Sequence, residues 1–461
     1  MAKAIFYSTL VSQPFFSTIL ETAASLDVYS TPPLGRRDRN QMQAEDQAAH
    51  RWYRFILSFP PHLVRDCIDK MGLGPQHRVL DPFCGTGTTL VECKKQGIPS
   101  VGVEANPMAH FASGVKIDWS PSPEELRHLA DQIATATERA IATHTGPLRQ
   151  LSEEAQKVLL KGSISPLPLH KTLLLLDQIY DRSSLFTAPH LRLAVAKATI
   201  DSISNLRFGP EVGVKKPKAD APVLQLWQQQ VQQIAQDLSL LNSLPPTSTR
   251  VEQGDARQLQ RLLTPASIDA VITSPPYPNE KDYTRTTRLE SVLLSFVENK
   301  AQLKQLKQAL LRSNTRNVYT ADQDDRWVAR HQGVQQIAAT IESRRQALGK
   351  TSGFSRLYPR AVKLYFGGMA CHLAGLRSRL RPGAQLAYVV GDQKSYLQVM
   401  IRTGHILGEI AEGLGYELLD IDLFRTRLAS ATQEHIGEEV VRLRWSGDGP
   451  KRPYPYSDLP L

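Results

Sequence analysis

The feature that most constrains the fold is a strand, a glycine turn, a helix and a second strand that follow one another within residues 78–104. The short apolar run Arg78-Val79-Leu80-Asp81 leads into the turn Pro82-Phe83-Cys84-Gly85-Thr86-Gly87. A helix is expected from about Thr88 to Gln96, because Gly97 stands where helices commonly end. The next apolar run is 100–104. This order of elements predicts an α/β domain.

A second short motif, Thr273-Ser274-Pro275-Pro276-Tyr277, lies far downstream and follows the strand-like run 268–273. Two successive prolines restrict φ and the conformation of the residues before them, so they hold nearby acceptors at a low entropic cost. The Ser274 hydroxyl and the carbonyl between the prolines are such acceptors, and Tyr277 adds an aromatic face. These groups suit a flat, amino-substituted ring.

The chain is long for a single core, and its composition changes several times along its 461 residues. The α/β pattern occupies residues 49–120, 250–294 and 361–461. The remaining segments are an N-terminal arm (1–48), a helical insertion rich in Leu, Gln and Ala (121–249) and a basic helical segment (295–360). We therefore expect an α/β fold with a large helical insertion.

Charge and cysteine content narrow the function classes. Lys and Arg exceed Asp and Glu by 55 to 45, and the resulting net charge of +10 suits a polyanionic partner such as nucleic acid. The four cysteines are scattered, so we expect neither a disulfide framework nor a metal site, and a reducing cytoplasm fits best. No stretch reads as a signal peptide or a membrane-spanning helix, and we expect no membrane partner.

The glycine turn indicates a site for a nucleoside-bearing cofactor. Glu104, at the end of the second strand, is placed to accept ribose hydroxyls. The turn lacks both the third glycine of the dinucleotide fingerprint and a phosphate-loop ending, which indicates a nucleoside without a pyrophosphate. Asp81 could accept from a cationic amine and Asp255 from an adenine amino group, and S-adenosylmethionine carries both. The alternatives are a structural strand-to-helix link and a helix-capping Asp255.

The second motif suits chemistry on an exocyclic amine. Such an amine is a poor nucleophile because its lone pair is delocalised into the ring. Acceptors fixed around the NH2 group draw the nitrogen toward a tetrahedral arrangement that faces the methyl donor. Tyr277 could stack on a base that has been flipped out of a duplex. The alternative is a polar turn after a buried strand.

These residues resemble the amino-group DNA methyltransferases, which modify cytosine N4 or adenine N6. The resemblance covers segments 50–112, 250–290 and 380–443. It implies a Rossmann-like, S-adenosylmethionine-dependent methyltransferase sheet, with the cofactor half in 49–120 and the target motif in 250–294. Phe59-Pro60-Pro61 is similar to the family's segment over the methionine end of the cofactor.

The site residues that we expect fall into two sets. The cofactor-binding residues are Phe59, Asp81, Pro82, Phe83, Gly85, Gly87, Thr88, Glu104, Asp255 and Ala256. The catalytic residues are Ser274, Pro275, Pro276 and Tyr277.

Serine at the first position of the target motif is similar to the cytosine-N4 group, whereas Asp or Asn there is more usual for adenine N6. The cofactor motif comes first in this chain, which departs from the commoner order of the cytosine-N4 group. The expected substrate is double-stranded DNA, and the enzyme is either solitary or one half of a restriction-modification pair with a cognate endonuclease. The alternatives are an adenine-N6 DNA methyltransferase, an RNA guanine-N2 methyltransferase and a catalytically silent DNA-binding protein.

Both the helical insertion and the basic segment are candidates for reading the DNA sequence. In the basic segment, phosphate contacts would anchor the protein, and Arg or Asn would read base edges. The basic residues there are Lys300, Lys304, Lys307, Arg312, Arg316, Arg344, Arg345, Lys350, Arg356 and Arg360. The alternative for these charges is a solvated helix face.

Overall fold

A computed structural model describes residues 42–54, 58–182, 184, 186–209, 211–279, 281–428, 435–449 and 453–459. Most of the predicted N-terminal arm, 1–48, lies outside these residues. Its described end holds the short helices η2 (Ala44–Asp46) and α2 (Gln47–His50).

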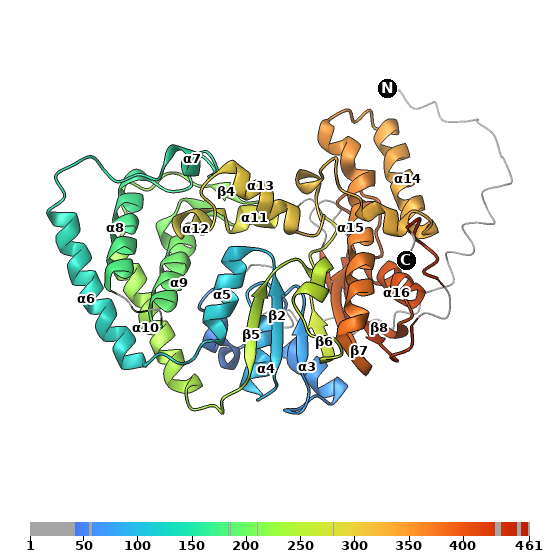
Figure 1. Ribbon diagram of the computed structural model, residues 1–461. Coiled ribbons are helices and arrows are strands. Elements are labelled where there is room, and N and C mark those ends of the chain that lie inside the picture. Colours follow the sequence, from blue (N-terminus) through green and yellow to red (C-terminus); the bar gives the residue numbers. More distant parts are fainter. Residues whose placement is uncertain are drawn as a thin grey trace, which may run out of the picture. The chain divides into compact units, whose positions relative to one another are not determined.

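A seven-stranded sheet forms the centre of the described protein, in the order β5-β2-β1-β6-β7-β9-β8 (Figure 1). Its strands are β1 (Val79–Asp81), β2 (Ser100–Glu104), β5 (Thr249–Gln253), β6 (Ile268–Thr273), β7 (Leu380–Gly391), β8 (Glu417–Leu428) and β9 (His435–Arg444). The first five strands in this order pair in parallel, whereas β9 is antiparallel to both β7 and β8. The predicted Rossmann-like α/β fold is confirmed.

Helices cover both faces of the sheet, which explains why the central strands β1, β2 and β6 are buried almost throughout. In β7 the residues alternate between two cores: Leu386, Tyr388 and Val390 face one, and Ala387 and Val389 face the other. The first core includes α15 (Gly353–Leu376) and α16 (Thr403–Gly413), and the second includes α3 (Pro61–Met71). The helices α4 (Thr88–Lys95) and α5 (Pro107–Ile117) follow β1 and β2.

The predicted insertion is largely helical. It consists of α6 (Pro123–Ala142), α7 (Glu153–Gln156), α8 (Pro166–Arg182), α9 (Ala188–Ala198), the π-helix η3 (Thr199–Ile203), a small hairpin of β3 (Leu206–Arg207) and β4 (Gly213–Val214), and α10 (Val223–Leu241). Ser122 caps α6 by accepting from the Glu125 N–H at 3.2 Å, and Pro123 occupies the first helical position.

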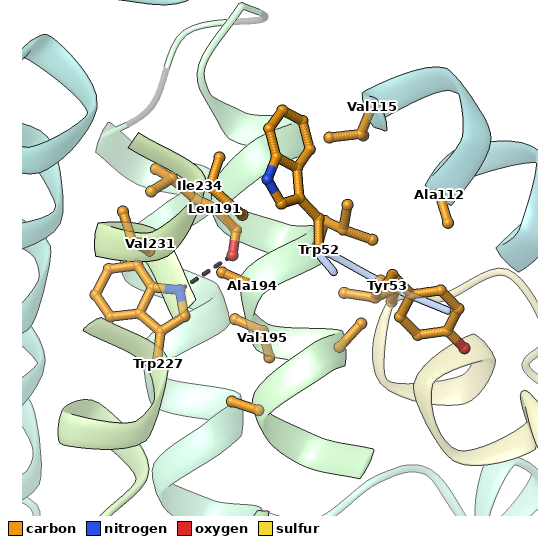
Figure 2. Close-up of a cluster of buried hydrophobic side chains, with 14 of the residues drawn as sticks. Trp52, Tyr53, Ala112, Val115, Leu191, Ala194, Val195, Trp227, Val231 and Ile234 are labelled. Atoms are coloured by element: carbon orange, nitrogen blue, oxygen red, sulfur yellow. Dashed lines mark hydrogen bonds between the residues drawn. The ribbon is translucent and has the colours of Figure 1, made fainter. Parts of the chain in front are cut away.

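The insertion shares a hydrophobic core with the sheet's own helices (Figure 2). The buried rings of Trp52 and Tyr53 lie between α5 on one side and α9 and α10 on the other. On α10, the fully buried Trp227 donates its indole N–H to the carbonyl oxygen of Leu191 on α9 at 3.0 Å. The insertion therefore packs against the cofactor half of the sheet through one continuous apolar cluster.

The segment after the target motif also folds into helices. It contains α11 (Tyr283–Thr286), α12 (Arg288–Leu293), α13 (Lys300–Ala309), η5 (Thr315–Asn317), η6 (Asp324–Val328) and α14 (Gln332–Ala347). Helix α15 continues through Pro359 and so joins the predicted segments 295–360 and 361–461. A Cβ atom at Gly367 would lie 1.8 Å from the carbonyl oxygen of Asp324, so glycine is what lets η6 cross α15.

There are two further short helices. The helix η4 (Ala256–Arg261) precedes β6 in sequence, and η7 (Arg377–Arg379) directly precedes β7. None of the helices within the described ranges has both the length and the apolar character that a membrane span requires.

Candidate active site

The glycine turn lies between the carboxyl end of β1 and the start of α4. Gly85 and Gly87 both have positive φ, of 51° and 81°, which side-chain-bearing residues rarely adopt. A Cβ atom at Gly87 would also lie 2.9 Å from the Cβ of Ser113 on α5. The turn therefore needs glycine for its backbone conformation and for the close approach of α5.

Asp81 is fully buried at the end of β1 and has unused acceptor capacity. Its Oδ1 accepts from the Thr273 hydroxyl at 2.6 Å and from the Phe83 N–H at 3.2 Å. Its Oδ2 has no hydrogen-bond partner. Burial raises the pKa of this carboxyl to about 6, although the hydrogen bonds from Thr273, Thr89 and the Phe83 N–H oppose the shift. A buried acceptor without a partner is unfavourable in the protein alone and is suited to a ligand that donates.

Glu104 ends β2 and points back at the glycine turn. One carboxylate oxygen accepts from the Gly85 N–H at 2.8 Å, and the other accepts from the Asn106 N–H at 2.7 Å. Burial, together with the nearby charge of Asp81, raises the pKa of Glu104 to about 7 despite these donors. The side chain is thus held in one orientation at the mouth of the turn.

The two motifs that are remote in sequence lie on neighbouring strands. β1 pairs with β6 in parallel, with Val79 opposite Ala270 and Leu80 opposite Val271. The hydrogen bond from Thr273 to Asp81 joins the residue before Ser274 directly to the cofactor motif. A second link runs from the Thr89 hydroxyl on α4 to the Ile272 carbonyl at 3.2 Å.

The target loop is held against β7. The Ser274 hydroxyl donates to the Val389 carbonyl at 3.1 Å, and the side chains of Ser274 and Tyr277 are also hydrogen-bonded. The Tyr277 ring lies so close to β7 that a Cβ atom at Gly391 would be 2.9 Å from it. Burial and the nearby Glu438 raise the pKa of Tyr277, so its hydroxyl stays protonated at neutral pH. Pro275 is buried and Pro276 is partly buried.

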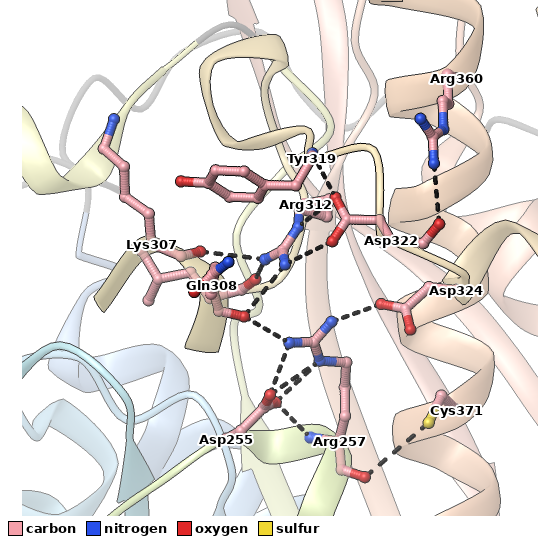
Figure 3. Close-up of polar contacts among 11 residues, drawn as sticks. Asp255, Arg257, Lys307, Gln308, Arg312, Tyr319, Asp322, Asp324, Arg360 and Cys371 are labelled. Carbon is pink, nitrogen blue, oxygen red and sulfur yellow. Dashed lines mark hydrogen bonds and ion pairs between the residues drawn. The ribbon is translucent and has the colours of Figure 1, made fainter. Parts of the chain in front are cut away.

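Asp255 follows β5 near Glu104, but its oxygens are already engaged (Figure 3). It caps η4 by accepting from the Arg257 N–H at 2.9 Å, and it accepts from the Arg257 guanidinium at 3.0 and 2.6 Å. Arg257 also pairs with Asp324, at the start of η6. Burial opposes ionisation, but the two carboxylates raise the pKa of Arg257. We call Asp255, Arg257 and Asp324 the ion-pair brace.

The other predicted cofactor residues lie around these groups. The Phe83 ring packs edge to face on His372 of α15, with ring centroids 5.0 Å apart, and the Ala256 carbonyl accepts from the same imidazole at 2.9 Å. Pro82 and Thr88 are buried. Phe59 packs against the apolar cluster of α3, which includes Ile272 and Val389.

Three contributors were not anticipated because their contacts are remote in sequence. Thr273 bridges the two motifs, and His372 contacts both Phe83 and Ala256. Lys116 of α5 is buried and donates to the carbonyl of Thr86 within the glycine turn at 2.6 Å. Burial lowers the pKa of Lys116 to about 7. A buried lysine two residues before a helix end gives no local signal of such a role.

The predicted basic residues divide into engaged and exposed ones. Arg312 is almost fully buried, pairs with Asp322 at 2.8 Å and donates to three carbonyl groups (Figure 3). Lys307 pairs with Asp282 at 2.7 Å, and Arg345 pairs with Glu342 at 2.6 Å. The exposed ones include Lys300, Lys304, Lys350 and Arg356.

Comparisons with known proteins agree with the fold and the motifs. Residues 25–112, which include the glycine turn, match the N6_N4_Mtase family, described as DNA methylase. Over 463 aligned residues the chain is 26% identical to the Type II methyltransferase M.BsoBI of Geobacillus stearothermophilus, and the alignment covers 88% of this chain and 86% of the relative. It is 25% identical over 418 residues to the Type II methyltransferase M.AvaI of Nostoc sp. (strain PCC 7120 / SAG 25.82 / UTEX 2576), covering 84% and 82%.

One further relative has a higher identity to this chain, but over a shorter stretch. Over 52 residues the chain is 42% identical to the Type II methyltransferase M.XycI of Xanthomonas campestris pv. cyanopsidis, covering 11% of this chain and 17% of the relative. The sheet order, the family match and the two long relatives agree with one another. The chain is therefore similar to the amino-group DNA methyltransferases, and its methyl donor is S-adenosylmethionine.

Proposed function

We propose that this protein is a site-specific DNA methyltransferase that transfers a methyl group to the exocyclic amine of a flipped base, and that the amine is cytosine N4. The observation that carries the proposal is the 2.6 Å hydrogen bond from Thr273 to Asp81. This bond joins the last residue of β1, which leads into the glycine turn, to the last residue of β6, which precedes Ser274. A methyl donor at one motif and an amine at the other would therefore share one site.

The residues at the carboxyl edge fit S-adenosylmethionine. Asp81 offers a buried, unpartnered carboxylate oxygen to the cationic amine, and Glu104 is fixed where it can accept ribose hydroxyls. Gly85 and Gly87 leave room for close backbone approach. When bound, the cofactor supplies an electrophilic methyl group on a sulfonium. The other residues that we assign to its site are Phe59, Pro82, Phe83, Thr88 and Ala256. The oxygens of Asp255 are engaged by Arg257, so we assign Asp255 a structural role.

Ser274 and its neighbours hold the target amine. Because the Ser274 hydroxyl uses its hydrogen on the Val389 carbonyl, its oxygen keeps lone pairs that can accept from an N–H. The carbonyl of Pro275 is a second acceptor in a loop made stiff by two prolines. Tyr277 supplies an aromatic face for the base. Two acceptors around one NH2 group localise the nitrogen lone pair in the direction of transfer.

The choice of cytosine N4 rests on Ser274 at the first position of the motif. The two long relatives are named Type II methyltransferases. We therefore extend the proposal to a restriction-modification pair, with a cognate endonuclease that reads the same DNA sequence.

The test is to incubate the protein with labelled S-adenosylmethionine and either duplex DNA or tRNA, and to identify the modified nucleoside by mass spectrometry. We expect label in DNA as N4-methylcytosine. N6-methyladenine would overturn the choice of base but keep the reaction class. Label in tRNA alone would favour the RNA guanine-N2 alternative, and no transfer to either would favour a silent DNA-binding protein.

A further inference from the structure

The tip of the α14–α15 hairpin exposes two large apolar side chains on a basic surface. Phe354 and Leu348 are 54% and 52% exposed. Single exposed apolar side chains are ordinary in folded proteins, so their exposure alone is weak evidence of a binding site. The surroundings of Phe354 are what distinguish it, and we use "hairpin tip" for Arg316, Leu348, Lys350, Phe354 and Arg356.

The polar members of the hairpin tip are all cationic. The guanidinium of Arg316, on η5, lies over the Phe354 ring at 5.9 Å from its centroid. Lys350 and Arg356 are exposed beside it in sequence. Two carboxylates also lie in this region: Glu342, on α14, is paired with Arg345, and Glu211 lies 3.8 Å from the Arg316 guanidinium. An exposed aromatic ring with a guanidinium over its face matches the stacked bases and flanking phosphates of nucleic acid.

One aromatic contact and two hydrogen bonds connect helix α15, which begins at the hairpin tip, to the target loop. Tyr358 follows Phe354 by one helical turn, so both side chains lie on the same side of α15. The rings of Tyr358 and Tyr396 lie 5.1 Å apart. The Tyr396 hydroxyl donates to the Asn279 carbonyl at 3.3 Å, and the Asn279 N–H donates to the Tyr277 carbonyl at 2.8 Å.

A second connection runs through η5, which carries Arg316. Just before η5, the side chain of Asn314 donates to the carbonyl of Lys281 at 2.9 Å, so this segment is tied to the continuation of the target loop. In Figure 1 the loop between α14 and α15 stands above the ends of the strands, as does the start of α15. The segment that carries Arg316 is therefore joined to the chain that follows Tyr277.

We propose that Phe354 inserts into the base stack of duplex DNA next to the target base, while Arg316, Lys350 and Arg356 contact the adjacent phosphates. This inference rests on the proposed function and adds a residue for the extrusion of the base. Extruding a base breaks its stacking and pairing, and an inserted apolar side chain replaces part of the lost stacking. Phe354 acts on the DNA conformation and takes no part in methyl transfer.

The test compares Phe354→Ala with Phe186→Ala, a matched control because Phe186 is 72% exposed on the connection between α8 and α9. The wild-type protein first methylates genomic DNA, and the modified position is located so that a short duplex around it can be made. We expect Phe354→Ala to weaken binding to this duplex by about tenfold or more, because stacking on one base is worth about 1–3 kcal/mol. Phe186→Ala should bind like the wild type.

A duplex with the target base mispaired isolates the extrusion step. Mispairing lowers the free-energy cost of extruding the base. The loss of DNA affinity in Phe354→Ala should therefore shrink to about threefold or less on this duplex. Phe354→Trp should restore binding to the paired duplex. Affinity for S-adenosylmethionine, measured by calorimetry, should be the same in all variants, which also shows that each variant is folded. If Phe354→Ala does not fold, Phe354→Leu is used in its place. We expect this variant to bind the paired duplex with an affinity between that of the wild type and that expected for Phe354→Ala.

Each contrary outcome has a distinct meaning. If the wild-type protein modifies DNA but Phe354→Ala and Phe186→Ala behave alike on both duplexes, the inference about Phe354 fails and the proposed function stands. An equal deficit on paired and mispaired duplexes would overturn the insertion role. A change in sedimentation with unchanged DNA binding would instead mark the hairpin tip as a contact between copies of the chain. If the wild-type protein modifies no DNA, both proposals fail.

Discussion

Two sets of carboxylates lie at the same edge of the sheet, and they differ in how fully they are paired. Asp81 and Glu104 face the glycine turn, and burial raises their pKa values to about 6 and about 7. Asp81 keeps one oxygen without a partner. In the ion-pair brace, Arg257 pairs with both Asp255 and Asp324. The difference indicates that the first pair is prepared for a ligand, whereas the brace holds η4 and η6 against α15.

The largest expected effect is on stability, from Arg257→Met. This change leaves two partly buried carboxylates without their cation, so we expect the free energy of unfolding to fall by about 3–5 kcal/mol. Urea denaturation measures it. The control is Arg381→Met, which removes a more exposed pair with Asp269 and should cost less than about 1 kcal/mol. Equal losses in the two variants would remove the distinction between brace and surface pair.

The next effect separates the target loop from the cofactor turn. Ser274→Ala removes an acceptor for the target amine, so we expect kcat to fall by about 100-fold or more, as on loss of one group that stabilises a transition state. Affinity for S-adenosylmethionine should stay within about twofold of the wild-type value. Glu104→Gln should do the reverse and mainly weaken the cofactor. The comparison would break if both variants lost cofactor affinity equally.

The third effect tests the comparison of the carboxylates directly. Asp81→Asn keeps an acceptor for Thr273 but removes the charge, so we expect S-adenosylmethionine to bind about 10- to 100-fold more weakly, the range for a hydrogen bond to a charged group. Asp255→Asn keeps a helix cap and should change this affinity by less than about threefold. Calorimetry measures both. A comparable loss in Asp255→Asn would instead support Asp255 as the acceptor for the adenine amine.

The smallest expected effect is a pH dependence of cofactor binding. Below a pH of about 6, Asp81 is protonated in the free protein, and a cationic ligand requires it ionised. Affinity for S-adenosylmethionine should therefore fall by about fourfold from pH 8 to pH 5.5, with proton release on binding. Calorimetry in buffers of different ionisation enthalpy measures that release. Asp81→Asn should flatten the dependence, and an unchanged slope would exclude Asp81 as its source.

The same pKa values have an opposite consequence for the protein without ligand. The folded state holds the Asp81 proton more tightly than the unfolded chain, in which the pKa is near 3.8. As pH rises from about 4 to about 6, this carboxyl therefore lowers the free energy of unfolding. A ligand that donates to the ionised form offsets that loss.

Local sequence predicted the elements closest to the site. The runs 100–104 and 268–273 are β2 and β6, and α4 ends one residue earlier than expected. Such elements follow from short apolar runs and from glycine, which depend on neighbouring residues alone. The helical segment expected to end at residue 360 continues to Leu376, because packing against η6 keeps α15 intact despite Pro359.

Contacts between remote residues were beyond local patterns. Asp255 fits both a cap and a cofactor ligand in sequence. Its partner Arg257 is only two residues away, but only the fold brings Asp324 to Arg257. The role of Lys116 could not be predicted from sequence either, since nothing near it in the chain indicates a hydrogen bond to the Thr86 carbonyl. The burial of Arg312 likewise depends on Asp322 and on the turn around it.

The pairing of β1 with β6 has a consequence for how such proteins can diversify. The two reactive motifs are neighbours in space whatever length of chain runs between them, because the register of the strands fixes their spacing. The intervening helices can therefore be lengthened, shortened or exchanged at a modest loop-closure cost, provided that they still cover the α5 side of the sheet. A scaffold of this kind keeps the spacing of its two motifs constant while the helices between them change.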